Sequence, residues 1–341
     1  MKQKIVLLLI FFSLNSLYTT TSDWVVESKK VYTAQEMEYN KRTHELLFKK
    51  TVSPFTQLIF SWNVYRPEKG TFSFFVRVRN AHTKKWDQWH HMLDWGADIQ
   101  KSYFSRGTFS VYHYARLELE KNNKADAFEI KVIADKKHIL SLVKALFVVT
   151  SDFTYFQSEP YQQRGRNLSS CFIKGIIPQS QIMIDHPRAN ALCSPTSVSM
   201  LVSYFNKKLI DTLEFARFVY DEGLDVFGSW GFNMAHAFEE APKNLLFYTT
   251  RLNSFADIHA LLKKGIPVAV SVRGAIKGAK KEYNNGHLMV IVGYDADHQK
   301  VMCYDPAFDT DDQVSRMYDL HDFIVAWERS RRLTYKPQVL V

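Results

Sequence analysis

The chain has 341 residues, 46% of them hydrophobic, which predicts two domains with sizeable cores. Its 44 Lys and Arg outnumber its 35 Asp and Glu, but the basic residues are scattered among acidic ones without a dense tract. This pattern favours a role of the charge in simple solubility, and binding to an anionic surface or to acidic substrates is the alternative. It argues against nucleic-acid binding.

Three cysteines are too few for a disulfide framework, and no clustered His and Cys spacing indicates a metal, so we expect no metal or other cofactor.

The N-terminus has the pattern of a signal peptide. Lys2 and Lys4 form a positive region, and an apolar run follows from residue 5 to residue 14. We expect residues 1–22 to be removed, which lowers the formal charge from +9 to +7 (9 − 2). An uncleaved anchor is the alternative, because no small-residue cleavage motif is present. The sequence therefore predicts a secreted or periplasmic protein with no integral membrane segment after cleavage.

Residues 23–158 have the alternating pattern of half-buried strands. Phe72, Phe74 and Val76 alternate with polar residues, and turn-forming stretches separate short strands throughout the region. The pattern predicts an all-β, sandwich-like domain. Four tryptophans that cluster in sequence indicate either core packing or stacking on sugar rings, which would make the domain a glycan- or cell-wall-binding module. These residues are Trp62, Trp86, Trp89 and Trp95.

A polar stretch at 157–170 predicts a linker, which we place at 159–174, ahead of a second domain at 175–341. Cys171 lies at the end of this linker. In an exported protein it could pair with Cys303 and leave the third cysteine free, or both could be buried thiols.

Cys193 lies at the first turn of a predicted amphipathic helix. Pro195 suits the first turn because its φ is preset and it lacks an N–H, and Val198, Leu201 and Phe205 supply the apolar stripe. Free backbone N–H groups at a helix start favour a thiolate, and they can donate to the oxyanion formed when that thiolate attacks a carbonyl. Cys193 is therefore a candidate nucleophile, with an inert core thiol as the alternative.

Two further helices are predicted, at 209–220 and from Ser254 onward. Ser254 and Asp257 have the spacing of a capping box, and Gly265 ends this second helix. Helices followed by strands predict an α+β fold for residues 175–341.

His287 and Asp305 stand at adjoining ends of a predicted β-hairpin. His287 opens a continuous apolar run bounded by glycines, and a second strand, 301–304, ends at Asp305 before a proline. The polar turn at 295–298 joins the strands, so the start of one lies beside the end of the other. The carboxylate would then accept one ring N–H and orient the other nitrogen toward Cys193. A strand-entry histidine and a turn aspartate without chemical roles are the alternative.

Several of these segments resemble the papain-like peptidase family C thirty-nine, the double-glycine peptidases, in its secreted bacterial peptidase-like branch. The resemblance covers about half of the chain, roughly from Gly175 to the C-terminus. The similar segments are Ile177-Pro178 through Gln181, Cys193 to Met200, Gly228 to Ala235, Gly265 to Val268, Gly286-His287-Leu288, Asp305-Pro306-Ala307 and Val314 to Trp327.

This resemblance implies a papain-like domain with a Cys–His–Asp triad. Cys193 would be the nucleophile, His287 the general base and acid, and Asp305 the group that orients the histidine. Gln181 would donate to the oxyanion, and Gln179 competes for that role on spacing.

The chain departs from the family next to the nucleophile. Ser194 stands where the bacteriocin-processing members have glycine, so the resemblance does not extend to double-glycine leader specificity. Trp230 and Asn233 either line the cleft or belong to a packed structural loop.

We therefore expect an exported cysteine hydrolase that cleaves peptide or amide bonds of a peptide or protein substrate through a thioacyl-enzyme intermediate. The same site could pass the acyl group to an amine, as an acyl transferase does. A catalytically silent glycan- or cell-wall-binding protein is the alternative from another class.

Overall fold

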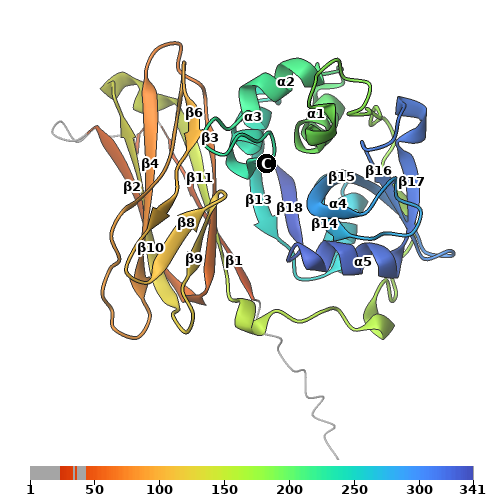
Figure 1. Ribbon diagram of the computed structural model, residues 1–341, viewed down its shortest axis with the longest axis horizontal. Helices are drawn as coiled ribbons and strands as arrows, with labels where there is room; N and C mark the ends of the chain where they lie inside the picture. Colours follow the sequence, from red (N-terminus) through yellow and green to blue (C-terminus); the bar gives the residue numbers. More distant parts are fainter. Residues whose placement is uncertain (1–23, 34, 37–43, 341) are drawn as a thin grey trace, which may run out of the picture.

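The computed structural model describes residues 24–33, 35–36 and 44–340, and the predicted signal peptide at 1–22 lies outside them. The first part of the chain forms two antiparallel sheets that lie face to face (Figure 1). One sheet has the strand order β1-β11-β3-β9-β8-β7, and the other has the order β2-β10-β4-β5-β6. The strands are β1 (Val25–Val31), β2 (Glu45–Phe55), β3 (Gln57–Val64), β4 (Thr71–Asn80), β5 (His90–Gly96), β6 (Gln100–Ser102), β7 (Ser105–Arg106), β8 (Ser110–His113), β9 (Arg116–Leu119), β10 (Ala125–Ala134) and β11 (Val143–Ser151).

Strand β4 has the predicted alternation of buried and half-buried side chains. Phe72, Phe74, Val76 and Val78 are all 0% exposed, and the residues between them are half-buried. One face of β4 therefore lies in the hydrophobic core, as period-2 patterning requires.

The four clustered tryptophans, Trp62, Trp86, Trp89 and Trp95, divide into two kinds. Trp62 and Trp95 are buried in the core, where their ring centroids lie 6.1 Å apart. Trp86 and Trp89 are half-buried, and the Arg77 guanidinium lies 5.0 and 4.6 Å from their ring centroids. Core packing is thus the role of two of the four rings, and stacking on sugars could involve only the other two.

The second part of the chain combines one antiparallel sheet with helices. The sheet has the order β13-β18-β14-β15-β16-β17, and β12 pairs with β15. This mixture of helices and strands is the α+β fold that the sequence predicts. Its elements are β12 (Cys171–Phe172), α1 (Cys193–Asn206), α2 (Thr212–Val219), α3 (Trp230–Glu240), β13 (Leu245–Arg251), α4 (Phe255–Lys263), β14 (Val268–Gly274), β15 (Tyr283–Asp295), β16 (Lys300–Tyr304), β17 (Ser315–Asp319), α5 (Leu320–Arg329) and β18 (Leu333–Val339).

Local capping explains where these helices begin. Helix α1 begins at Cys193, so the thiol lies in the first turn of the helix, as predicted. Helix α2 begins later than predicted because the Asp211 side chain caps it, accepting the N–H of Leu213 at 2.8 Å. The capping box at α4 is confirmed, since the Ser254 N–H donates to the Asp257 carboxylate at 3.0 Å.

The two parts of the chain share a continuous hydrophobic core. All eight residues of β3 are buried, and this strand packs against α3 and β13 of the second part. The Trp62 ring meets the Phe232 ring edge-on with centroids 5.4 Å apart. A Cβ at Gly231 would lie 2.3 Å from the Trp62 ring, so this close approach of α3 requires glycine there. The interface is therefore built like a domain interior.

The segment predicted as a linker, 159–174, lies along the second part of the chain. The Glu159 N–H donates to the Glu328 carboxylate at 2.7 Å, and the Glu159 carboxylate accepts the N–H of Phe255 at 3.1 Å. The segment ends in β12, which adds a short strand to the sheet beside β15. This connection is thus fixed at both ends by hydrogen bonds.

The possible disulfide between Cys171 and Cys303 is not formed, and both thiols are free. Cys171 lies on β12 and Cys303 on β16, which pair with opposite sides of β15. Two strand spacings separate their backbones by about 9–10 Å, beyond the roughly 7 Å limit for a bridge. Only Cys303 is a buried thiol, since Cys171 is half-buried.

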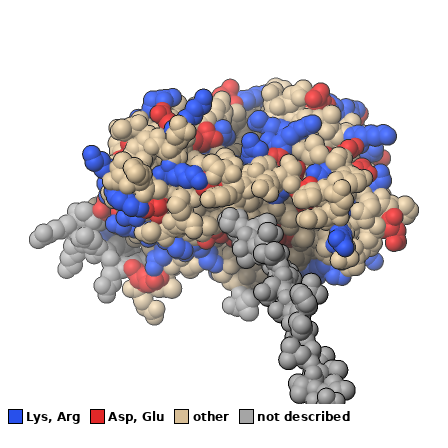
Figure 2. All heavy atoms as spheres, turned by 90° about the horizontal axis from the view of Figure 1, so that it is seen from below, with Lys and Arg blue, Asp and Glu red and all other residues tan. Residues whose placement is uncertain are grey.

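Within the described residues, no helix has the length and apolar character needed to cross a membrane. On the face shown in Figure 2, Lys and Arg side chains are interspersed with Asp and Glu. This distribution matches the scattered charge of the sequence.

Candidate active site

Cys193 lies where helix α1 meets the sheet. Its N-cap residue, Leu192, makes no side-chain capping bond, so the first N–H groups of the helix have no competing cap. The Cys193 side chain is half-buried, whereas the following residues of α1 are buried. Helix α1 packs against β15, the strand that carries His287.

His287 and Asp305 are brought together by the predicted hairpin of β15 and β16. Val290 pairs with Tyr304 in this hairpin, which makes His287 and Asp305 diagonal neighbours on one face. The His287 Nε2 and Asp305 Oδ1 atoms lie 2.7 Å apart. His287 is 4% exposed and Asp305 is 0% exposed, so their bond is shielded from water. The hairpin and its His–Asp contact are confirmed.

Asp305 accepts further hydrogen bonds from residues that sequence reasoning missed. Tyr283 and Tyr318 each donate a hydroxyl to Asp305 Oδ2 at 2.6 Å, and the Ala307 N–H donates to Oδ1 at 3.1 Å. Burial opposes the charge of this carboxyl, but the His287 charge and hydrogen bond and the two tyrosines outweigh it and hold the pKa below its usual value. Asp305 is therefore an anion at neutral pH.

Tyr283 also stacks on the imidazole. The ring centroids of Tyr283 and His287 lie 4.1 Å apart, with 15° between the ring planes. Residues four apart on a straight strand lie about 13 Å apart, too far for stacking. The pairing of β15 with β14 shifts register between Tyr283 and His287, and Gly286 within this stretch has φ +90°, a conformation that glycine adopts readily, so the chain bends there.

The thiol and the imidazole form an acid–base pair. Burial alone would raise the pKa of Cys193, but the hydrogen bond and positive charge of His287 lower it, helped by the backbone N–H groups of Leu288 and Ser194. The net effect is a pKa below the ordinary value of a thiol.

The contact with Cys193 and the contact with Asp305 also change the pKa of the His287 imidazole. Burial disfavours the imidazolium, but the Asp305 charge and hydrogen bond, together with Cys193, raise the pKa of His287 to about 9. Because Nε2 bonds to Asp305, Nδ1 is the nitrogen left for the thiol. The lowered pKa of Cys193 and the raised pKa of His287 both act in favour of a thiolate paired with an imidazolium.

The two candidate glutamines have different surroundings. Gln181 is 2% exposed; its Nε2 donates to the Ala189 carbonyl at 3.0 Å, and its backbone N–H donates to Pro306 at 2.9 Å. Gln179 instead accepts the Thr212 hydroxyl at 2.8 Å, which ties it to α2. Gln181 thus joins the loop before the thiol to the loop after Asp305, and its oxyanion role stays a prediction.

Trp230 and Asn233 belong to packing. The Asn233 Nδ2 donates to the carbonyls of Phe227 and Ser229, each at 2.8 Å, and fixes the loop that leads into α3. The Trp230 ring faces the first part of the chain, with the Arg116 guanidinium 6.0 Å from its centroid. The packed-loop interpretation therefore holds for both residues.

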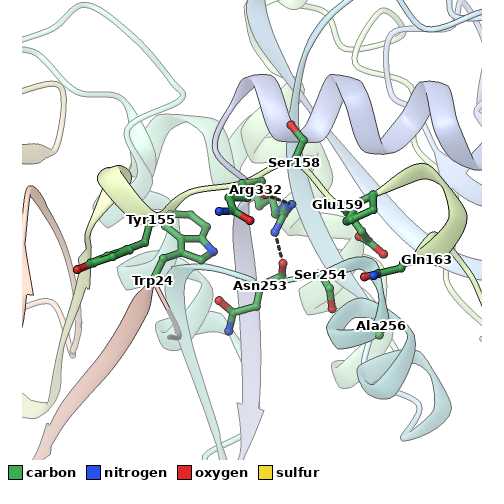
Figure 3. A pocket seen from close by; sticks show the side chains of 11 residues that line it. Trp24, Tyr155, Ser158, Glu159, Gln163, Asn253, Ser254, Ala256 and Arg332 are labelled. Atoms are coloured by element: carbon green, nitrogen blue, oxygen red, sulfur yellow. Dashed lines mark hydrogen bonds between the residues drawn. The ribbon is translucent and has the colours of Figure 1, made fainter. Parts of the chain in front are cut away.

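A cavity lies away from this site, at the junction of the two parts of the chain (Figure 3). It has a volume of about 600 Å³, and Trp24, Glu159, Asn253 and Arg332 are among its lining residues. The Arg332 guanidinium donates to the Asn253 carbonyl there. None of its described lining residues is a cysteine or histidine, so the cavity does not contain a second thiol–imidazole pair. Within the described residues, no group of His, Cys, Asp and Glu is placed to hold a metal ion.

A helix that begins at a thiol and packs on an antiparallel sheet bearing a histidine defines a papain-like domain. Residues 173–335, just under half of the chain, match the sequence profile of the Peptidase_C39 like family, so this part of the chain is similar to that family of peptidases. The resemblance predicted from the motifs is thereby confirmed for the peptidase family.

Comparison with solved structures finds a Bacillus anthracis crystal structure described as that of a C39-like peptidase. It is 17% identical in sequence, with a TM-score of 0.38, and the match covers 50% of this chain and 98% of that one. No protein with a curated description matches the sequence.

Proposed function

We propose that the protein is an exported cysteine hydrolase that cleaves peptide or amide bonds of a peptide or protein substrate. Cys193 is the nucleophile, His287 the general base and acid, and Asp305 the group that orients the histidine. The observation that carries this proposal is the buried 2.7 Å contact between His287 and Asp305 beside a thiol whose pKa is lowered. The similarity of residues 173–335 to the Peptidase_C39 like family supports the same chemistry.

The reaction begins when the Cys193 thiolate attacks the substrate carbonyl carbon. The carbonyl electron pair moves onto oxygen, where the backbone N–H groups of the α1 start and the Gln181 amide stabilise the negative charge. The carbon–nitrogen bond then breaks as the His287 imidazolium gives its proton to the leaving amine. The product of this half is a thioester on Cys193 and a neutral imidazole.

The second half releases the acyl group. Neutral His287 takes a proton from water, the oxygen of that water attacks the thioester carbonyl, and the carbon–sulfur bond breaks. The thiolate and the imidazolium are regenerated, and a carboxylic acid leaves. An amine in place of water would make the same site an acyl transferase, and product analysis by mass spectrometry distinguishes the two outcomes.

Export rests on the N-terminal pattern of Lys2, Lys4 and the apolar run at 5–14. N-terminal sequencing of protein from the extracellular or periplasmic fraction tests it. A start at or shortly before Asp23 is expected, and an intact Met1 in a membrane fraction would contradict cleavage.

Iodoacetamide alkylation tests the site directly. In the full chain carrying Cys171→Ser, Cys193 is expected to react far faster than free cysteine at pH 6, because only a thiolate reacts and its pKa is lowered. His287→Ala removes the stabilising cation and should abolish this advantage. If Cys193 reacts at the rate of free cysteine and His287→Ala changes nothing, the proposed function is wrong.

A further inference from the structure

Tyr283 contacts both the histidine and the aspartate of the site. Its ring stacks on His287 with centroids 4.1 Å apart, and its hydroxyl donates to Asp305 at 2.6 Å. The side chain is 3% exposed, and the bend at Gly286 sets its position within β15. One residue thus restrains the ring plane of the base and the carboxylate that orients it.

Tyr318 is a natural control within the same site. It donates to the same Asp305 oxygen at the same distance, 2.6 Å, and it is 1% exposed. It comes from β17, on the far side of β16, and in the described part of the chain its ring makes no stacking contact with His287. The two tyrosines therefore share a hydrogen bond and differ in the stack.

We propose that Tyr283 is a positioning residue of the thiol site, whose ring holds the His287 imidazole in the plane that presents Nδ1 to Cys193. This inference rests on the proposed function.

The stack matters because the Asp305 bond alone fixes only one atom of the ring. A single hydrogen bond to Nε2 leaves the imidazole free to rotate about that contact, whereas a parallel ring at 4.1 Å limits the rotation. A small misplacement of a catalytic group costs up to about 10²-fold in rate. The ring and the hydroxyl of Tyr283 consequently have separable roles, one on the histidine and one on the aspartate.

Paired substitutions separate these roles. Tyr283→Phe and Tyr318→Phe each remove one hydroxyl from Asp305 and keep the ring. Tyr283→Leu and Tyr318→Leu also remove a ring, which stacks on the histidine in the first case and not in the second. All four substitutions are made in the full chain that also carries Cys171→Ser. Because Cys303 is 0% exposed, iodoacetamide then reports on Cys193.

The measurement is the rate of alkylation against pH. Tyr283→Phe and Tyr318→Phe should shift the acid limb of the profile by similar small amounts. Tyr283→Leu should move that limb to higher pH by about one unit relative to Tyr318→Leu, a tenfold loss of rate at a fixed pH on the limb. Thermal unfolding of both Leu variants measures how much stability each ring contributes. If the role of Tyr283 were purely structural, Tyr283→Leu would lower the melting temperature, but its pH profile would match that of Tyr318→Leu.

The outcomes distinguish the inference from the function on which it rests. Fast alkylation that is lost in His287→Ala, with Tyr283→Leu and Tyr318→Leu showing the same profile, would overturn the role of Tyr283 and leave the proposed function standing. Slow alkylation of the chain with both tyrosines intact would overturn both.

Discussion

The side-chain amide of Asn63 exchanges two hydrogen bonds with the backbone of Phe247. Asn63 Nδ2 donates to the Phe247 carbonyl at 2.7 Å, and the Phe247 N–H donates to Asn63 Oδ1 at 3.0 Å. Asn63 is on β3 and Phe247 is on β13, and both are 0% exposed. A side chain of the first part of the chain thus pairs with a strand of the second part, as the backbone of a neighbouring strand would.

Asn63→Ala should therefore destabilise the whole protein. The substitution leaves a buried N–H and a buried carbonyl without partners, which costs about 3 kcal/mol of unfolding free energy. Urea unfolding measures this loss. Asn244→Ala, which truncates an exposed amide near the start of β13, is the control and should change stability by less than about 0.5 kcal/mol. Equal stability of the two variants would show that this contact contributes nothing to the interface.

The pH dependence of hydrolysis should differ from that of alkylation. Both need the thiolate, so both rates fall as pH drops through the lowered pKa of Cys193. Hydrolysis also needs the imidazolium to protonate the leaving amine, so its rate should fall as pH rises through about 9, the pKa of His287. Alkylation has no leaving amine and should stay fast above that pH. Rates of peptide hydrolysis and iodoacetamide uptake, measured on one preparation between pH 4 and 10, test this; parallel profiles at high pH would contradict the acid role of His287.

The His–Asp contact could be predicted because its determinants are local. An apolar run, a polar turn and a second strand specify a hairpin, and pairing along the hairpin brings His287 next to Asp305. Strand β4 and helix α1 were likewise predictable, since period-2 and period-3.6 patterns are properties of short segments.

Other features depend on contacts that no local pattern encodes. Tyr318 reaches Asp305 from a third strand, and Asn63 meets a backbone 184 residues away in the chain. Tyr283 lies four residues before His287, so its proximity could be suspected, but its stack follows from the bend at Gly286. The different partners of the two glutamines also depend on tertiary structure, since both residues lie on one loop but Gln181 bonds to Ala189 and Gln179 to Thr212.

The cysteines should remain reduced even in an oxidising compartment. Cys171 and Cys303 lie on opposite sides of β15, and the pKa of each thiol is raised, chiefly by burial. Denaturation without a reductant, followed by alkylation and mass spectrometry, should label all three cysteines of the chain. Labelling of a single cysteine would show that the other two are bridged, which requires a rearranged sheet.

Gln181→Ala should separate binding of the oxyanion from formation of the thiolate. If the Gln181 amide donates to the developing oxyanion, its removal lowers the hydrolysis rate by about 10²–10³-fold. Iodoacetamide alkylation forms no oxyanion, so the reactivity of Cys193 should be kept. The bond from Gln181 to the Ala189 carbonyl could instead make the residue purely structural, and then both rates would fall together. Gln179→Ala is the matched control, because it removes an amide of the same loop whose bond goes to Thr212, and it should leave the oxyanion site in place. A larger loss of hydrolysis in Gln179→Ala than in Gln181→Ala would reverse the assignment of the two glutamines.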